Sequence, residues 1–404
     1  MSLSEDLKWR GFVNQTTIKD ISKLDDEKLT FYWGVDPSSD SMTVGNLAAA
    51  MMVRQFMNAG HKAILLIGGA TGLIGDPDGK NQERDLKPRE EIEANKKAIV
   101  SQYSKIFEGL DFEVVDNYDW FKDIKYVDFL RDYGKHFSMT QLLDRDFVKS
   151  RIGEGGSGIS YAEFSYSLIQ GYDFLHLFRE KGVTLQVSGS DQWGNSLAGV
   201  ELIRKIENQS ADVYTTPIII NKYTGQKFGK SEEGAIWLDD KKTSVYRFYQ
   251  FWLNVDDDGV IDYLRVYTLL SREQIDRLGV ESVSNPSDRA AQKTLAFEVT
   301  KLVHGSDRAE SVRKVTEVLF GDNSNVNQLD QDQLKLLSDE IPTTTFGTLS
   351  DRLLEKGIVE SKGEFRRLLD GGAFSVNGQK ITEDQEISEI SLVKKGKNIF
   401  ILVQ

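Results

Sequence analysis

The sequence contains no cysteine, and this absence excludes several kinds of chemistry at once. A chain of 404 residues without a thiol has no disulfide bond, no thiolate zinc site and no cysteine nucleophile. Only four histidines are present, and no two of them have the spacing of a pair of metal ligands. The sequence therefore predicts no metal held by the protein itself.

Long apolar runs are absent as well. No stretch approaches the roughly 20 apolar residues of a membrane-spanning helix, and the acidic first dozen residues lack the apolar core of a signal peptide. We therefore expect a cytoplasmic protein with no membrane partner. The net charge of −13 argues against a protein that coats nucleic acid, although it leaves room for a local basic face.

The first half of the chain alternates between predicted strands and helices. Apolar and aromatic residues predict strands at 29–35 and 62–67, with a helix at 43–59 between them. This spacing is typical of a parallel α/β unit in a globular protein of two or three domains. The same patterns predict further strands at 112–115, 183–187 and 217–220, and further helices at 88–107, 118–137, 161–181 and 196–206.

A glycine-rich segment, GGATGLIGDPDGK, follows the strand predicted at 62–67. It matches neither the G-x-G-x-x-G fingerprint of dinucleotide binding nor the phosphate-binding P-loop, so both of those enzyme types are poorly supported. Glycines beside Asp76 still suit the close approach of a small ligand.

Three polar residues fall on one face of the helix predicted at 161–181. Tyr166, Gln170 and Asp173 are spaced at i, i+4 and i+7, among apolar residues. The next strand runs into SGSDQ, a small polar turn whose aspartate can hold a ribose hydroxyl. From these residues alone, a ligand site and a buried polar network that only fixes the core both remain open.

The pentapeptide KFGKS, residues 227–231, carries two lysines three positions apart. Such a cationic loop can close over phosphates, although considered alone it is more often a solvated surface turn.

The end of the chain differs in composition from the rest. Residues 244–320 are mostly helical in pattern, and the acidic segment 321–346 predicts a linker. In 347–404, nine acidic and nine basic residues balance, so the rest of the chain carries the whole negative charge. Within this small module Ser361 and Glu364 predict a helix start, and Asn377–Gly378 predicts a β-hairpin.

Taken in order, seven stretches resemble the bacterial-type tyrosyl-tRNA synthetases of class I. They are YWGVDPSSDSMTVGN, GGATGLIGDPDGK, GKHF, EFSYSLIQGYDF, LQVSGSDQWGN, KFGKS followed by AIWLD, and SKGEFRRLLDGGAFSVNG. The last stretch is similar to the S4-type RNA-binding module that often ends these enzymes, and the resemblance covers most of the chain.

This resemblance implies an α/β fold in several parts. A Rossmann-like catalytic domain with a parallel sheet would span 1–222, and the KFGKS loop with a helical anticodon-side domain would span 223–320. After the linker 321–346, an α+β S4-like RNA-binding domain would span 347–404.

The resemblance also implies an activity. The enzyme would activate L-tyrosine with ATP and Mg²⁺, release pyrophosphate, and transfer tyrosine from tyrosyl-adenylate to the 3′ end of tRNA(Tyr), as a homodimer. The carboxylate of the substrate is the nucleophile in this reaction, so the protein only positions the substrates and stabilises growing charge. A chain without cysteine and with few histidines suits that chemistry.

The resemblance assigns the tyrosine site residue by residue. Tyr32 and Asp173 match the pair that binds the phenol. The substrate ammonium would contact Asp76, Tyr166 and Gln170. Gln186 matches a residue near the carboxylate, and Gln192 lines the same pocket.

It likewise assigns the nucleotide site and the catalytic cations. ATP would be bound by Gly34, Asp36, Ser38, Thr43, Gly45, Asn46, Gly189, Asp191 and Lys230. Catalysis would use Lys227, Lys230, Ser231, Thr43, Asn46, Lys80 and Arg84. RNA binding would use Lys362, Arg366 and Arg367.

The sequence departs from the family pattern at four positions. Thr43 and Asn46 stand at the two histidines of the HIGH signature, Trp33 stands where a small residue is usual, and Ser188 replaces a common glycine. Two alternatives stay open. A tryptophanyl-tRNA synthetase shares the fold but is disfavoured by the Tyr32–Asp173 pair, and a non-catalytic RNA-binding relative is favoured only by Thr43.

Overall fold

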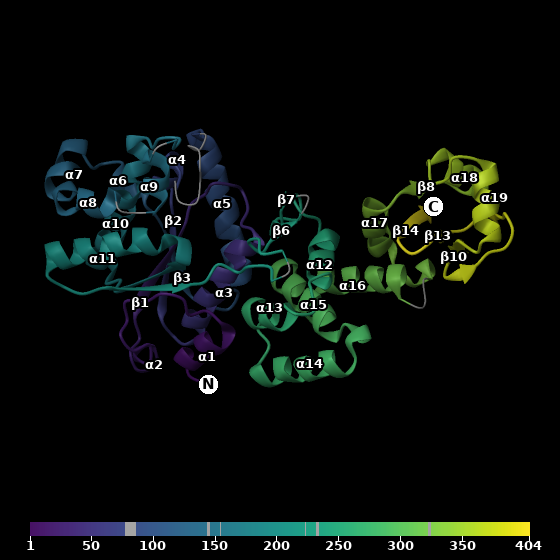
Figure 1. Ribbon diagram of the computed structural model, residues 1–404, viewed down its shortest axis with the longest axis horizontal. Helices are drawn as coiled ribbons and strands as arrows, with labels where there is room; N and C mark the ends of the chain where they lie inside the picture. Colours follow the sequence, from purple (N-terminus) through teal and green to yellow (C-terminus); the bar gives the residue numbers. More distant parts are fainter. Residues whose placement is uncertain (77–85, 144–145, 154, 223, 232–233, 322–324) are drawn as a thin grey trace. The chain divides into compact units, whose positions relative to one another are not determined.

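The computed structural model describes residues 1–404 except 77–85, 144–145, 154, 223, 232–233 and 322–324 (Figure 1). The chain divides into two compact units, which are described separately. Unit 1 comprises residues 1–243 and 255–295, and unit 2 comprises residues 244–254 and 296–404. Among the described residues, no helix is long and apolar enough to cross a membrane.

Unit 1 is built on a five-stranded parallel sheet, which confirms the predicted α/β fold. Its strand order is β3-β2-β1-β4-β5, with each neighbouring pair parallel. The order changes direction between β1 and β4, and ligands of open α/β sheets bind at such a switch, beyond the carboxyl ends of the strands. The strands are β1 Thr30–Val35, β2 Lys62–Ile67, β3 Phe112–Asp116, β4 Leu185–Gly189 and β5 Asp212–Thr216.

Helices cover both faces of this sheet. Successive strand residues point to opposite faces, so Phe31 packs on Phe56 of α3 whereas Tyr32 packs on Phe174 of α10. Figure 1 shows α10 and α11 to the left of the strands and α3 and α5 to the right. These helices are α3 Val44–Asn58, α5 Arg89–Ile106, α10 Tyr161–Lys181 and α11 Trp193–Glu207.

Shorter elements complete unit 1. They are α1 Leu3–Arg10, α2 Lys23–Asp26, α4 Thr71–Ile74, α8 Met139–Leu143, α9 Asp146–Ile152, α13 Val260–Tyr267, α14 Arg272–Ser284 and the short strands β6 Lys230–Ser231 and β7 Gly234–Ala235. Helix α15, Ala290–His304, begins in unit 1 and continues in unit 2.

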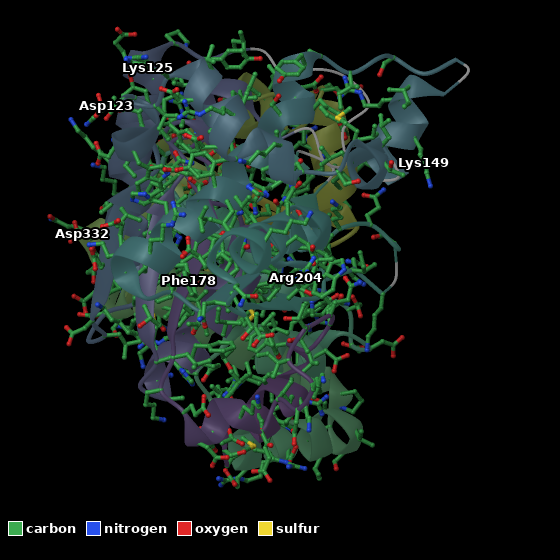
Figure 2. All side chains as sticks on the ribbon, turned by 90° about the vertical axis from the view of Figure 1, so that its left-hand side faces the viewer. Asp123, Lys125, Lys149, Phe178, Arg204 and Asp332 are labelled. Carbon is green, nitrogen blue, oxygen red and sulfur yellow. The ribbon has the colours of Figure 1, made fainter. Side chains whose placement is uncertain are left out.

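Two predictions in unit 1 are corrected by the structure. The single helix expected at 118–137 is divided into α6 Tyr118–Phe121, α7 Tyr126–Asp132 and a 3₁₀ turn, Gly134–His136. The exposed residues Asp123 and Lys125, labelled in Figure 2, lie at the first break. The separate pieces bring Phe121, Phe129 and Tyr133 around Tyr172 of α10.

The second correction concerns the last strand of the sheet. It was expected at 217–220, but β5 ends at Thr216. Pro217 has no N–H to donate to a sheet, so the strand stops immediately before it. The chain after β5 is therefore free to line the end of the sheet.

Unit 2 combines helices with an antiparallel sheet of order β11-β10-β13-β14-β8, in which only β8 is parallel to its neighbour. The predicted hairpin is confirmed, because Asn377 and Gly378 adopt positive φ angles of 47° and 80° between β10 and β11. The helices are α12 Val245–Leu253, α16 Ser306–Phe320, α17 Gln331–Glu340, α18 Leu349–Glu355 and α19 Lys362–Asp370. The strands are β8 Thr343–Thr344, β9 Gly347–Thr348, β10 Phe374–Val376, β11 Gln379–Lys380, β12 Glu386–Ile387, β13 Ser391–Lys395 and β14 Ile399–Val403.

The described part of the segment 321–346, expected to be a linker, is packed structure. Asp330 caps α17 by accepting a hydrogen bond from the Gln333 backbone, and β8 pairs with β14. Val326, Leu329 and Leu337 are buried against α16 and the strands β13 and β14. The segment resembles a linker in sequence because its acidic residues occupy the start and the exposed side of α17. The segment folds nevertheless, because a few apolar residues of it are buried.

Candidate active site

The carboxyl ends of the unit 1 strands open into one cavity of about 500 Å³. Its walls come from the ends of β1, β4 and β5, the start of α3, the middle of α10 and the segment that includes Lys227. All seven residues predicted for the tyrosine site line it: Tyr32, Asp76, Tyr166, Gln170, Asp173, Gln186 and Gln192. Eight of the predicted ATP residues line it as well: Gly34, Asp36, Ser38, Thr43, Gly45, Asn46, Gly189 and Asp191.

Four other predicted catalytic residues are not placed. Lys80 and Arg84 lie outside the described residues, as do the side chains of Lys230 and Ser231. Lys227 lines the cavity and is exposed.

One end of the cavity is closed by a buried carboxylate. Asp173 and Tyr32 are each 1% exposed. Asp173 accepts one hydrogen bond from Trp120 Nε1 at 2.9 Å and another from Asn117 Nδ2 at 3.1 Å. The Tyr32 hydroxyl has no partner among the described residues. This end therefore offers a phenol and a carboxylate side by side in a dry setting, which suits a ligand that carries a hydroxyl.

Protonation at this end follows from burial. Burial raises the pKa of Asp173 well above its usual range, while the hydrogen bonds from Asn117 and Trp120 oppose that rise. Burial, reinforced by the neighbouring carboxylate, also raises the pKa of Tyr32. Burial and the nearby carboxylates of Asp36 and Asp76 raise the pKa of Tyr166. Both phenols consequently keep their protons and act as hydrogen-bond donors.

A series of hydrogen bonds connects Asp173 with Tyr166 at this end of the cavity. Asn117 Nδ2 also donates to Thr71 Oγ1 at 3.1 Å, and Thr71 Oγ1 donates to Asp36 Oδ1 at 2.6 Å. The other oxygen of Asp36 accepts a bond of 2.8 Å from the Tyr166 hydroxyl. The hydrogen bonds through Asn117, Thr71 and Asp36 therefore fix the positions of the Asp173 and Tyr166 side chains relative to each other.

A second group of polar atoms faces the middle of the cavity. Asp76 Oδ2 accepts a bond of 2.6 Å from Gln192 Nε2, and Gln192 Oε1 accepts one of 3.1 Å from Asn195. The side-chain oxygens of Gln170 and Gln186 are buried without a partner among the described residues. Several acceptors and a carboxylate around one space suit a primary ammonium group, which brings three donors.

The start of α3 forms the more open end of the cavity. Thr43 is the N-cap residue, and Asn46 Oδ1 accepts bonds of 2.9 Å from both the Thr43 backbone N–H and its hydroxyl. This arrangement commits the amide oxygen of Asn46 and leaves its Nδ2 donors to other partners. The N-terminus of a helix also attracts anions through its backbone N–H groups.

The loop 227–229 lies against this helix start. Gly229 has φ +90°, and a Cβ at this position would come 3.1 Å from Val44 Cβ of α3. Phe228 stacks on Tyr263 with ring centroids 4.2 Å apart. A glycine that fits closely against α3 and a buried aromatic neighbour hold Lys227 at the cavity.

Sequence reasoning missed several residues of the site. Asn117 and Trp120 donate hydrogen bonds to the buried carboxylate of Asp173, and Thr71 accepts another from Asn117. None of the three was predicted to belong to the site. Asn117 had a usable signal, since it lies two residues after the strand predicted at 112–115 and the carboxyl ends of parallel strands meet at one edge. The apolar lining residues Ile218, Ile219 and Phe228 carried no such signal.

Comparison with known proteins gives consistent results. Residues 24–321 match the family described as tRNA synthetases class I (W and Y). The chain is 43% identical over 423 residues to the tyrosine–tRNA ligase of Bacillus caldotenax, and 41% identical over 423 residues to tyrosine–tRNA ligase 2 of Bacillus cereus. Both alignments cover 100% of this chain and of the relative.

Solved structures agree. A C-terminally truncated mitochondrial tyrosyl-tRNA synthetase of Aspergillus nidulans matches with a TM-score of 0.71 and 30% identity, over 79% of this chain and 94% of that one. The tryptophanyl-tRNA synthetase of Plasmodium falciparum matches with a TM-score of 0.55 and 15% identity, over 82% of this chain and 87% of that one, which is a likeness of fold alone.

Proposed function

This chain belongs to the family of class I tRNA synthetases for tryptophan and tyrosine, and we propose that within it the chain is a tyrosine–tRNA ligase. It activates L-tyrosine with ATP to tyrosyl-adenylate, releases pyrophosphate, and transfers tyrosine to the 3′ end of tRNA(Tyr). The observation that carries this proposal is that all seven residues predicted to bind the substrate tyrosine line one cavity. They include the buried carboxylate of Asp173, which accepts hydrogen bonds from two neutral donors.

The phenol of the substrate reaches Asp173 and Tyr32. Its hydroxyl donates a hydrogen bond to Asp173 and accepts one from Tyr32. The Tyr32 hydroxyl keeps its proton because it is buried. Phenylalanine would leave both of these buried groups unpaired, and a site of this kind rejects the analogue without the hydroxyl by roughly 10⁴-fold or more. An indole fits the pair poorly, since its single N–H could not accept the Tyr32 proton.

The substrate backbone lies among the polar atoms in the middle of the cavity. Its ammonium group contacts Asp76, the Tyr166 hydroxyl and Gln170 Oε1. Gln186 lies near the carboxylate, and Gln192 positions Asp76 through their hydrogen bond.

ATP occupies the rest of the cavity as its magnesium complex. Gly189 and Asp191, at the end of β4, contact the ribose. The start of α3, with Gly45 and Asn46, faces the phosphates, together with the residues Gly34, Asp36, Ser38 and Thr43 of the preceding strand and turn. No group of three or more His, Asp or Glu ligands exists among the described residues, and magnesium enters with the nucleotide as substrate.

The chemical step is the attack of the tyrosine carboxylate on the α-phosphorus, which expels pyrophosphate. The protein positions the two substrates and stabilises the charge that grows on the phosphates. Lys227 and Asn46 lie where they can do so, and the sequence assigns the same task to Lys230, Ser231, Lys80 and Arg84.

An exposed apolar surface supports a homodimer. Tyr126, Val127, Met139, Leu143, Ile152 and Tyr161 lie on α7, α8, α9 and the start of α10, and each is more than 40% exposed. The hydroxyl of Tyr126 donates to that of Tyr161 at 3.3 Å, so these two side chains of α7 and α10 lie side by side. Large exposed apolar patches of this kind mark protein interfaces, and we propose that a second copy covers it.

The tRNA contact falls to the S4-like region of unit 2. Arg366 and Arg367 are exposed on α19, and Lys362 pairs with Asp351 at 2.6 Å. The division into a catalytic domain 1–222, a helical domain 223–320 and an RNA-binding domain 347–404, like the cytoplasmic location, remains a prediction from the sequence.

Exchange of labelled pyrophosphate into ATP tests the activity directly. The purified chain should catalyse exchange with tyrosine, and much more slowly with tryptophan or phenylalanine. A preference for tryptophan would identify a tryptophanyl enzyme. No exchange with any amino acid, at any magnesium concentration, would identify a non-catalytic relative.

A further inference from the structure

We propose that Thr216, the last residue of β5, is a specificity-determining residue that hydrogen-bonds the adenine ring of ATP. This proposal deepens the proposed function and rests on it, because it requires ATP to be the second substrate. The resemblance to the synthetases assigned no role to Thr216.

The first observation is a buried hydroxyl without a partner. Thr216 lines the cavity and is 2% exposed, and its Oγ1 makes no hydrogen bond among the described residues. The adjacent Thr215 shows the contrast, since its hydroxyl donates to Gln15 O and accepts from Gln15 N, both at 3.0 Å. A buried polar group left unpaired destabilises the protein, so an oxygen at a cavity wall is expected to find its partner in the ligand.

The other unpaired atoms of the cavity already have a use. Tyr32 Oη, Gln170 Oε1 and Gln186 Oε1 line the same cavity, are buried and lack partners among the described residues. The proposed tyrosine substrate supplies a partner for the first two through its hydroxyl and its ammonium group, and it lies against Gln186. Thr216 Oγ1 shares their state, but the tyrosine substrate supplies no partner for it.

The surroundings of Thr216 indicate which part of ATP it meets. Its Cα is the partner of Gly189 in the register of β4 and β5, and Gly189 is a proposed ribose contact. The next residues, Pro217, Ile218 and Ile219, also line the cavity and carry no charge.

Further apolar residues line the same cavity. Ala48 and Ala49 of α3 and Phe228 line the same cavity. Phosphates need cations or helix N–H groups, which this cavity presents at Lys227 and at the start of α3. Apolar walls instead suit a flat aromatic ring with a polar edge, and in ATP that group is adenine.

The hydroxyl can meet that edge in two ways. It can donate to a ring nitrogen, or it can accept from the exocyclic amino group. A neutral hydrogen bond of either kind contributes about 0.5–1.5 kcal/mol, which corresponds to about 2- to 13-fold in kcat/KM for ATP.

The test begins with the nearly isosteric substitution Thr216→Val in the full-length protein. In pyrophosphate exchange, kcat/KM for ATP should fall about 2- to 13-fold, while KM for tyrosine stays within about twofold of the wild type. Thr216→Ser retains the hydroxyl and should keep the wild-type value.

Thr300→Val is the matched control. Thr300 is 0% exposed and its Oγ1 also lacks a partner among the described residues, but it lies on α15 and does not line the cavity. Its substitution should leave kcat/KM for ATP unchanged. An equal fall in both variants would mean that losing a buried hydroxyl matters only for stability, and would overturn the proposal.

Two ATP analogues then locate the contact. The probe 7-deaza-ATP lacks the N7 acceptor, and purine riboside triphosphate lacks the exocyclic amino group. The penalty that the wild type shows for one of them should disappear in Thr216→Val. Unchanged ATP kinetics in folded Thr216→Val, or analogue penalties that persist in full, would overturn the role of Thr216.

Should Thr216→Val not fold, Thr216→Ala measured against Thr216→Ser gives the same comparison. A wild-type protein without exchange would refute the proposed function instead.

Discussion

The two compact units of this chain differ in whether they bury charged side chains. Unit 1 buries four charged side chains, Arg10, Arg151, Glu163 and Asp173, whereas unit 2 buries none among its described residues. Unit 2 instead keeps its cations on the surface, as on α19. A unit that recognises a small polar substrate has to remove charge from water, and a unit that grips a polyanion has to keep charge in water.

The four buried charges are themselves instructive. Arg151 and Glu163 form a bidentate pair with bonds of 2.6 and 3.0 Å. Arg10 bonds Asp6 and three backbone carbonyls. Of these four side chains, Asp173 alone has no partner of opposite charge among the described residues, and it accepts hydrogen bonds from two neutral donors. A buried charge whose surroundings are incomplete marks the place that a ligand completes.

The largest expected effect comes from removing that charge. Asp173→Ala should lower the preference for tyrosine over phenylalanine in pyrophosphate exchange by about 100-fold or more, since the substrate hydroxyl loses its carboxyl partner. Thermal unfolding of the same variant checks that it is folded. A folded variant with an unchanged preference would show that Asp173 does not read the phenol.

The next effect concerns the open end of the same cavity. Lys227→Ala should lower the rate of adenylate formation about 100-fold, because it removes a cation from the charge that grows on the phosphates. Tyrosine binding should stay within about twofold of the wild type. Single-turnover kinetics separate the two quantities. Lys222→Ala is the control, since Lys222 is exposed and pairs with Asp262 away from the cavity lining. A pure binding defect in Lys227→Ala would count against a role in the transition state.

Charge reversal in unit 2 should leave activation intact and weaken the RNA contact. Arg366→Glu combined with Arg367→Glu should weaken tRNA binding at least about tenfold at low salt, and reduce the salt slope by about 2, because two phosphate contacts are lost. The double variant Lys314→Glu and Lys335→Glu is the control, with the same charge change on exposed residues of α16 and α17. Equal weakening by both pairs would show that only overall charge matters and that α19 is not the contact.

The smallest effect is expected at the start of α3. Thr43→His should keep the activation rate or raise it, within about threefold, because the Thr43 backbone N–H still orients Asn46 and the imidazole adds a donor near the phosphates. A fall of more than tenfold would show that the threonine hydroxyl itself, through its bond to Asn46, is needed for activation.

Much of the fold followed from apolar patterns in the sequence. The strand at 62–67 was predicted with its observed bounds, and the helix at 43–59 differs by one residue at each end from α3. Errors arose where tertiary contacts override local pattern. The helix predicted at 118–137 breaks because its aromatic residues surround Tyr172, and the acidic segment 321–346 folds because Val326, Leu329 and Leu337 find an apolar neighbour.

The site shows a similar division. The residues expected to touch tyrosine or ATP were identified through the resemblance, and those whose side chains the structure describes line one cavity, whereas the residues that support them were missed. Asn117 and Trp120 support the site by donating to Asp173, which lies 56 and 53 positions away in the sequence, and apart from the place of Asn117 near a strand end nothing in their local sequence indicates that contact. A supporting side chain is defined by distance in space, which a single sequence does not contain.

The two donors that hold Asp173 have a consequence for redesign. An engineer who wishes to admit a bulkier or apolar para-substituted phenylalanine would begin by replacing Asp173 with a small residue. That change alone would leave the buried Asn117 amide and the partly buried Trp120 indole without an acceptor for their hydrogen bonds. Because Asn117 also supports Thr71, and through it Asp36 and Tyr166, the disturbance would spread to the ammonium side of the cavity. A library that varies Asp173 together with Asn117 and Trp120 should therefore yield folded, active variants far more often than one that varies Asp173 alone.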